Sequence, residues 1–222
     1  DTYDIDESLI EYLSIKDTCT KAELTTREML AHQAQLWPWI PFYRETLTEK
    51  GGPNPAIYSS IQKGEFQIKV ADHIYMNTTY LDTIVDRVIH SKMWEEKGYK
   101  YSDLAYYILK EIIEKQEGSS LKELIQERLY KSLGANYTTY HPLEKFTTNT
   151  IVPTEDDTYF RNQLLRGYVH DPGAAMQNGV GGHAGLFSNA NDLAKLMQMY
   201  LNGGTYGGIR YIEEETVEEF TS

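Results

Sequence analysis

Cysteine is almost absent from this sequence, which excludes one whole class of covalent stabilisation. Cys19 is the only cysteine among 222 residues, so no disulfide can form within the chain. Its surroundings, KDTCTKAEL, contain no histidine or cluster of basic residues that would activate the thiol. We therefore expect an inert thiol rather than a nucleophile, and the cysteine count does not indicate a redox compartment.

Positive charge is also scarce, and long apolar runs are missing. The chain has 21 Lys and Arg against 33 Asp and Glu, a formal net charge of −12. This balance argues against electrostatic binding to nucleic acid or to an anionic membrane. No stretch approaches the roughly eighteen consecutive apolar residues that a membrane-spanning helix needs. The hydrophobic fraction of 41% is typical of a folded globular protein.

The start of the chain lacks the features of a native N-terminus. Its first residues, DTYDIDESLI, contain no methionine, no basic region and no apolar core of a secretory signal. The last residues, EEETVEEFTS, are polar and indicate a helical turn. We interpret both ends as lying inside a longer protein, so the sequence leaves the cellular compartment unknown.

Motifs for metals, phosphates and paired catalytic acids are missing as well. The six histidines are scattered, and none forms an HxH or HxxxH pattern. His170 and Asp171 are adjacent, but neighbours on a loop rarely bind one ion. The glycine-rich string NGVGGHAG lacks the lysine and the preceding strand of a phosphate loop. We expect no metal and no cofactor, and a glycosidase has little support because no two acids stand apart from the solvated ones.

The sequence does contain strong helix signals. Thr25 with Glu28, and Ser120 with Glu123, have the spacing of capping boxes, in which side chains bond the free N–H groups of a first helical turn. Gly134 suits the left-handed residue that ends a helix. These positions predict helix starts near residues 25 and 120 and a helix end near 134.

Apolar residues recur at helical spacing in three further stretches. The faces that we expect to point inward are Leu81, Ile84, Val85, Val88 and Ile89; Leu104, Ile108 and Ile112; and Leu193, Leu196, Met197, Tyr200 and Leu201. Strand signals are weak, apart from a short hairpin turning at Gly207 and Gly208. Segment 141–190 is rich in Gly, Pro, Asn and Thr and has no regular period. We therefore predict a mainly α chain with few short strands and a long irregular segment.

Two strings match Ser-x-x-Lys, in which a lysine one helical turn after a serine activates its hydroxyl. They run from Ser60 to Lys63 and from Ser119 to Lys122. A glycine directly after Lys63 leaves no helix to hold the first pair. The second string opens a helix in which Ser120 already has a capping role. We reject both strings as nucleophile motifs.

Four segments together resemble a known family. In chain order they are LTTREMLAHQAQLWPWIPFY, YKYSDLAYYILKEIIEK, LKELIQERLYKSLGANYTTYHP and GYVHDPGAAMQNGVGGHAGLFSNANDLAKLMQMYLNGG. They resemble the serine hydrolases related to class C β-lactamases and penicillin-binding proteins, including β-lactamase-like esterases. The resemblance covers nearly the whole chain.

This resemblance implies the β-lactamase/transpeptidase-like α+β fold. We expect one truncated domain over residues 1–222, in which the helical subdomain occupies 20–135. Segment 141–190 would line the cleft, and residues 191–222 would form a helix and a hairpin. Most of the five-stranded sheet of the family would lie outside this sequence. The face that should pack on that sheet would then be exposed, so we expect homo-oligomers or a rearranged packing in isolation.

The family uses three motifs, Ser-x-x-Lys, Tyr-x-Asn and Lys/His-Thr-Gly, and only the second is identifiable here. Tyr101 matches its tyrosine, and Asp103 stands where many members carry asparagine. The resemblance implies that Tyr101 shuttles a proton to the serine and the leaving group. Asp103 would orient the motif lysine or hold the substrate amide, although an aspartate cannot donate as an amide does. Ser102 would cap the helix that begins at Leu104.

His183 and Gly185, in the string GGHAG, are the candidate substrate-binding residues. By position this string resembles the glycine-rich lead-in to the helix at 192–201 rather than the third motif of the family. A wall of the cleft is therefore the alternative to direct substrate contact.

The resemblance implies a hydrolase that cleaves an ester or amide through an acyl-serine intermediate, on a cell-wall peptide or a small ester. Because the first and third motifs are not found, we predict that this chain is an inactive fragment of that enzyme. The bacterial periplasm or cell envelope is the usual place of the family, and some relatives are fused behind a family-three glycoside hydrolase. The alternative is a non-catalytic helical interaction module on the same scaffold, docking through WPWIPFY and GGHAGLF.

Overall fold

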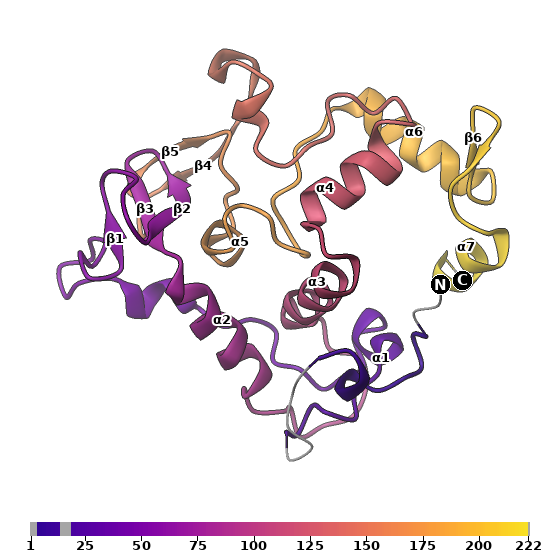
Figure 1. Ribbon diagram of the computed structural model, residues 1–222, viewed down its shortest axis with the longest axis horizontal. Coiled ribbons are helices and arrows are strands. Elements are labelled where there is room, and N and C mark those ends of the chain that lie inside the picture. Colours follow the sequence, from indigo (N-terminus) through magenta and orange to yellow (C-terminus); the bar gives the residue numbers. More distant parts are fainter. Residues whose placement is uncertain (1–3, 14–18, 222) are drawn as a thin grey trace.

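The structure, a computed structural model, describes residues 4–13 and 19–221 (Figure 1). The α-helices are α1 (Thr26–Leu30), α2 (Thr79–Ile89), α3 (Leu104–Glu117), α4 (Leu121–Ile125), α5 (Pro172–Met176), α6 (Ala190–Leu201) and α7 (Glu214–Thr221). The strands are β1 (Tyr58–Ser59), β2 (Phe66–Ala71), β3 (Ile74–Asn77), β4 (Pro153–Asp157), β5 (Gln163–Arg166), β6 (Thr205–Tyr206) and β7 (Ile209–Arg210). None of the helices in these residues has the length and apolar character needed to cross a bilayer.

The expectation of a mainly α chain is wrong. Helices account for 37% of the structure and strands for 16%, which makes the fold class α+β. Within the described residues the strands form three antiparallel sheets, with the orders β1-β3-β2, β4-β5 and β6-β7. Two of these sheets, β1-β3-β2 and β4-β5, lie in regions where no strand was predicted.

The sequence of β2, which pairs with β3, does contain a strand signal. It was missed because the helical periods elsewhere in the chain are stronger. Apolar and polar residues alternate over 66–70, the period of a strand with one buried face. Ile68 and Val70 are accordingly buried, and Ile68 lies opposite Met76. The connecting turn contains His73 at φ 55° instead of the glycine or asparagine that usually marks a tight hairpin. This turn chemistry explains why the hairpin is hard to predict.

The long segment 141–190 is more regular than expected, because it contains β4, β5 and α5. The loop between and after these strands is built around Asp157 and Arg161, whose side chains are both fully buried. The guanidinium Nε of Arg161 donates to Asp157 Oδ2 at 2.7 Å, and its Nη1 donates to the backbone oxygen of Val169 at 2.7 Å. A third bond goes to the backbone oxygen of His170. One buried arginine thus fixes the chain that leads into α5.

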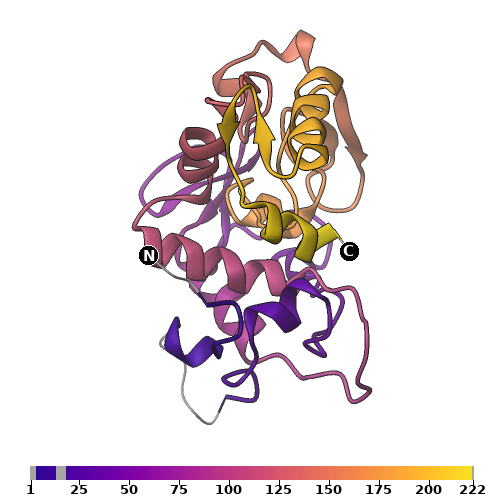
Figure 2. The same cartoon turned by 90° about the vertical axis from the view of Figure 1, so that its right-hand side faces the viewer.

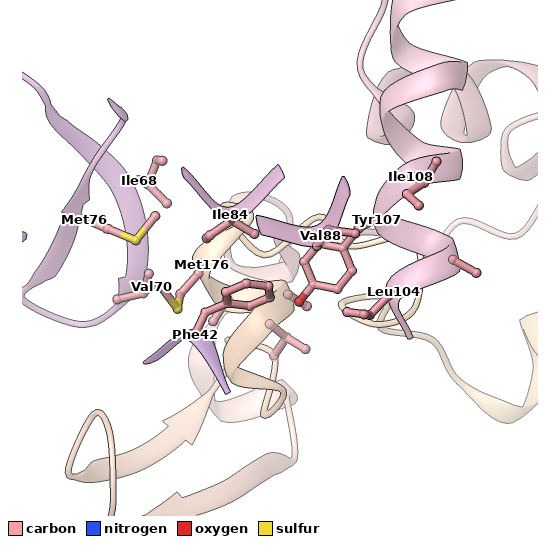
Figure 3. Packing of buried hydrophobic residues seen from close by; sticks show 14 of the residues in the cluster. Phe42, Ile68, Val70, Met76, Ile84, Val88, Leu104, Tyr107, Ile108 and Met176 are labelled. Carbon is pink, nitrogen blue, oxygen red and sulfur yellow. The ribbon is translucent and has the colours of Figure 1, made fainter. Parts of the chain in front are cut away.

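Helix α3 lies among α1, α2 and α4 and supplies much of the main core (Figure 1). Its predicted inner face is confirmed, since Leu104, Ile108 and Ile112 are at most 3% exposed. Figure 3 shows Leu104 and Ile108 beside Val88 of α2, with β2 and α5 on the other side of the cluster. Burying each such side chain contributes about 1.5–3 kcal/mol, so packing rather than propensity holds α3 in place.

Both predicted capping boxes are confirmed. The Thr25 hydroxyl accepts from the N–H of Glu28 at 3.2 Å, and the Glu28 carboxylate accepts from the N–H of Thr25 at 2.9 Å. Ser120 and Glu123 make the same reciprocal pair at the start of α4. Gly134 has φ 69°, the left-handed conformation expected after a helix.

The predicted inner face of α6 is wrong except at Leu196, which packs against a small core cluster around Met199. The structure buries Asp192 and Met199, whereas Met197 is 50% and Leu201 81% exposed. Asp192 lies inward because its carboxylate accepts the backbone N–H of Tyr137 at 2.6 Å, a bond that the apolar period does not reveal. The apolar stripe of α6 therefore faces outward.

A short hairpin packs beside α6, as Figure 2 shows. Strands β6 and β7 pair antiparallel, with Tyr206 opposite Ile209. The two connecting residues, Gly207 and Gly208, have φ 58° and 82°, which side chains rarely adopt. The predicted hairpin turn is confirmed.

Candidate active site

Tyr101 stands on a turn before α3 that Ser102 fixes. The Ser102 side chain is buried, and its hydroxyl donates to the backbone oxygen of Trp37 at 2.6 Å. The Ser102 Oγ also accepts the N–H of Leu104 at 3.1 Å, so the predicted capping role is confirmed. The N–H of Ser102 donates to Nδ1 of His32 at 3.2 Å. These three hydrogen bonds tie the turn to the helix and to the segment around residues 32–37.

His32 supports the aromatic ring of Tyr101. The two ring centroids are 4.7 Å apart, and Tyr99 contacts the same imidazole edge to face at 5.7 Å. Because Nδ1 of His32 accepts from Ser102, the proton of the neutral ring lies on Nε2. The Tyr101 side chain remains 55% exposed. Nothing in the sequence singled out His32, since its role depends on a turn that brings residues 32 and 101 together.

The Asp103 carboxylate governs the protonation of Tyr101. Its negative charge raises the pKa of the Tyr101 phenol, and a hydrogen bond between the two side chains adds to this effect. Among the described residues, no cation counteracts the shift in pKa. The phenol therefore stays protonated at neutral pH and can donate a hydrogen bond or a proton. A nearby ammonium would be needed to turn it into a base.

A small cavity of about 80 Å³ lies beside this turn, and its wall includes Asp103, Tyr107, Asp171, Gly173 and His183. The fold thus brings together Asp103 and His183, which are eighty positions apart in the chain. A Cβ at Gly173 would lie 1.9 Å from the Tyr107 hydroxyl, so only glycine fits there.

Tyr101 does not line this cavity, and Gly185 lines a separate cavity of about 370 Å³. Gly185 has φ 118°, and a Cβ at this position would lie 2.3 Å from the backbone oxygen of Gly179. A Cβ at Gly182 would lie 2.5 Å from the backbone oxygen of Tyr106 in α3. The glycines of GGHAG therefore permit close packing of this segment on itself and on α3.

The side chain of His183 is buried between a carboxylate and an aromatic ring. Its side chain is 4% exposed, and Nε2 lies 3.0 Å from Asp171 Oδ1. The imidazole stacks on Tyr107 with the ring centroids 4.8 Å apart. Burial opposes ionisation of Asp171, but the hydrogen bonds from His183 and from the N–H of Ala174 outweigh it and lower the pKa. The substrate-binding role of His183 stays a prediction.

Asp171 is a site residue that sequence reasoning missed. It appeared only as the neighbour of His170 in a rejected metal pair, whereas its partner in the structure is His183. The same carboxylate accepts the N–H of Ala174 and so caps α5. Within the described residues, no group of three His, Cys, Asp or Glu side chains is arranged to hold a metal ion.

The rejected Ser-x-x-Lys strings offer no activated serine in the structure. Lys122 Nζ lies 2.6 Å from a carboxylate oxygen of Glu144, and the Ser120 hydroxyl belongs to the capping box. Ser60 lies exposed in a bend outside any helix. Neither string therefore places a serine hydroxyl beside a free lysine.

Comparison with known proteins identifies the family. A family model described as beta-lactamase matches residues 1–221. The chain belongs to the beta-lactamase family. A protein described as "Putative D-alanyl-D-alanine carboxypeptidase" from Escherichia coli K12 is 40% identical over 134 residues, which are 55% of this chain and 31% of that protein. Its counterpart from Salmonella newport is 41% identical over 133 residues, or 54% and 31% of the two chains.

Solved structures that are similar to this beta-lactamase family member have the same fold. The octameric penicillin-binding protein homologue from Pyrococcus abyssi has a TM-score of 0.61 at 18% identity, covering 97% of this chain and 42% of that chain. The D-amino acid amidase from Ochrobactrum anthropi has a TM-score of 0.58 at 17% identity, with coverages of 97% and 51%. The chain spans about a third of the curated relatives' length and about half of these solved chains. The predicted membership of a β-lactamase-related hydrolase family is confirmed.

Proposed function

We propose that this chain supplies the tyrosine side of an active site that hydrolyses an amide bond through an acyl-serine intermediate. The observation that carries the proposal is the exposed phenol of Tyr101, held by Ser102 at the start of α3 and adjoining the Asp103 carboxylate. Membership of the beta-lactamase family supports hydrolytic chemistry. A protonated phenol at a rigid, solvent-facing position is suited to general acid catalysis.

In the proposed reaction a serine hydroxyl attacks the substrate carbonyl and passes its proton to the Tyr101 phenolate, which forms a tetrahedral intermediate. Tyr101 then donates this proton to the leaving nitrogen as the bond from carbon to nitrogen breaks, which leaves the acyl-serine. In the second half Tyr101 takes a proton from the water that attacks the ester and returns it to the serine oxygen as the acid is released. Asp103 would hold the ammonium of the motif lysine, whose positive charge would lower the pKa of Tyr101 in the assembled site.

The substrate that we propose is a cell-wall peptide ending in D-alanyl-D-alanine. This follows the names of the curated relatives, and an amidase among the structural neighbours also favours an amide over an ester. A small ester, as in β-lactamase-like esterases, is the alternative substrate. Fusion to a glycoside hydrolase and self-association of the chain stay predictions.

We further propose that the 222-residue chain is inactive by itself. A fluorophosphonate probe should leave it unlabelled, whereas the gene product that contains it should be labelled on a serine of a Ser-x-x-Lys motif. Stoichiometric labelling within residues 1–222, mapped by mass spectrometry, would contradict this proposal.

The role of Tyr101 is tested in the gene product by comparing Tyr101→Phe with Tyr99→Phe. Loss of the phenolic proton should lower kcat on an acylated D-alanyl-D-alanine peptide by about 10²–10⁴-fold with little change in KM. Tyr99 is a matched control because its ring also contacts His32 and is 72% exposed. Equal activity of the Tyr101 variant and the wild type, with both folded by circular dichroism, would refute the role.

A non-catalytic interaction module is the second candidate, favoured by the exposure of Trp37 and Trp39 at 41% and 53%. Exposed tryptophans are common at binding surfaces. Absence of the serine and Lys/His-Thr-Gly motifs from the gene product would favour this module over the hydrolase.

A further inference from the structure

Two adjoining cavities lie among strand β2, residues 164–169 and residues 143–148. Their volumes are about 370 and 680 Å³, and both are lined by Lys69, Leu143 and Tyr168. The smaller cavity shares no lining residue with the cavity beside Asp103. It is therefore a separate concave site, and its volume falls in the range of roughly 300–1,000 Å³ that is typical of small-molecule sites.

The larger cavity carries more positive than negative charge. Lys69 and Arg166 line it together with one acid, Asp72. Lys69 Nζ is 3.5 Å from Asp72 Oδ1, but both side chains are largely exposed, so this pair binds weakly. Arg166 is half-buried and has no ion-pair partner within the residues that the structure describes. The chain as a whole has a net charge of −12 and repels anions. The two cations make this cavity an exception, so it favours an anionic ligand.

Tyr168 holds the Lys69 ammonium in place and adds a hydroxyl to the wall that the two cavities share. Its ring centroid is 5.2 Å from Lys69 Nζ, and its hydroxyl donates to Asp72 Oδ1 at 2.7 Å. Burial is the main cause that raises the pKa of Tyr168 to about 12. The phenol therefore stays uncharged at neutral pH and does not oppose an anion.

The smaller cavity provides an apolar wall next to this charge. Val70, Val169, Ala175 and Phe187 line it. Glu144 also lines it, but its carboxylate lies 2.6 Å from Lys122 Nζ and is already compensated. The paired cavities thus place an apolar compartment, which Lys69 also lines, beside a compartment that contains both Lys69 and Arg166.

The geometry points to a binding site for a small amphipathic carboxylate. Its carboxylate would bind Lys69 and Arg166 in the larger cavity, since a guanidinium and a carboxylate can form two parallel hydrogen bonds. Its apolar chain would lie against Val70 and Phe187 in the smaller cavity. This inference does not rest on the proposed hydrolase function, because no residue near Tyr101 takes part in it.

Isothermal titration of the 222-residue chain with hexanoate tests the site. We expect saturable binding at one site and at least about tenfold weaker binding of hexanoate to Lys69→Met and to Arg166→Gln, since each removes a charge-assisted bond. Lys50→Met is the matched control, because Lys50 is an exposed lysine that lines neither cavity. It should bind hexanoate as the wild type does.

Ligand variants on the wild-type chain test both halves of the site without any substitution. Hexan-1-ol and hexylammonium should bind at least about tenfold more weakly than hexanoate, and acetate should bind more weakly for want of an apolar chain. Hexanoate affinity should also fall with added NaCl, because the cations are partly exposed. Equal binding of hexan-1-ol, of hexylammonium or of acetate, or affinity independent of salt, would overturn the inference.

Discussion

Replacing Arg161 by methionine tests whether one buried ion pair organises the chain that leads into α5. The substitution keeps the apolar stem but leaves the Asp157 carboxylate and the backbone oxygens of Val169 and His170 without their donor. Both side chains of the pair have no exposed area, so water cannot replace the guanidinium. Removing one partner of a buried pair costs about 3–5 kcal/mol of unfolding free energy. For a chain of this size the midpoint of thermal unfolding should fall by about 6–20 °C.

The pH dependence of this effect has a defined sign. Burial raises the pKa of Asp157, but the hydrogen bonds from Arg161 and from the N–H groups of Phe160 and Tyr159 outweigh it and lower the pKa. A carboxylate with a depressed pKa stabilises the fold above the unfolded value near 3.8 and loses this contribution as the pH falls below it. In Arg161→Met the unpaired carboxylate is most costly when charged. The difference between variant and wild type should therefore be larger at pH 7 than at pH 4.

A double-mutant cycle with Asp157→Asn separates the ion pair from general damage. The asparagine oxygen can still accept the N–H groups of Tyr159 at 3.0 Å and Phe160 at 2.8 Å. The double variant should thus be more stable than the sum of the single changes predicts, with a coupling of about 0.5–3 kcal/mol in urea unfolding. A loss below about 1 kcal/mol for Arg161→Met, or strict additivity, would refute the reasoning.

Two further predictions concern packing and association. Gly182→Ala should lower the free energy of unfolding in urea by about 1–3 kcal/mol, because its Cβ would lie 2.5 Å from the backbone oxygen of Tyr106. Gly52→Ala is the control and should lower it little, because the nearest atom to a Cβ there is 3.9 Å away. Equal stabilities of the two variants would contradict the steric argument. Light scattering should show that the chain self-associates and that Leu201→Lys on the exposed stripe of α6 shifts the mass toward the monomer. A clean monomer of the wild type at high concentration would rule out self-association.

The helices could be predicted well where local chemistry determines them. Capping boxes at Thr25 and Ser120 depend on residues three positions apart, and the inner face of α3 follows from its own period. The same reasoning failed for α6, because a buried carboxylate at Asp192 is bonded to the distant N–H of Tyr137. Periodicity shows which face of a helix is apolar, but the neighbouring elements decide which face is covered.

Strands were harder to predict because their stability comes from partners far along the chain. The alternation over residues 66–70 was readable, but the turn at His73 lacks a usual hairpin residue. Strands β4 and β5 contain charged and amide side chains, and Arg161 holds the loop that connects and follows them. A buried arginine is rare enough that sequence rules place it on the surface. Arg161 thus holds together three points of a segment for which no regular structure was predicted.

The candidate site shows why residue identity alone does not determine chemistry. Tyr101 and Asp103 were recognisable from a motif, yet the effect of one on the other follows only from their placement. The carboxylate raises the pKa of the phenol, so this pair by itself makes a poorer base than an isolated tyrosine. A proton shuttle must give up its proton and then recover it, and the carboxylate supports only the protonated form. A cation beside Tyr101 and Asp103 would support the deprotonated form as well, because it would stabilise the phenolate and compensate the charge of Asp103.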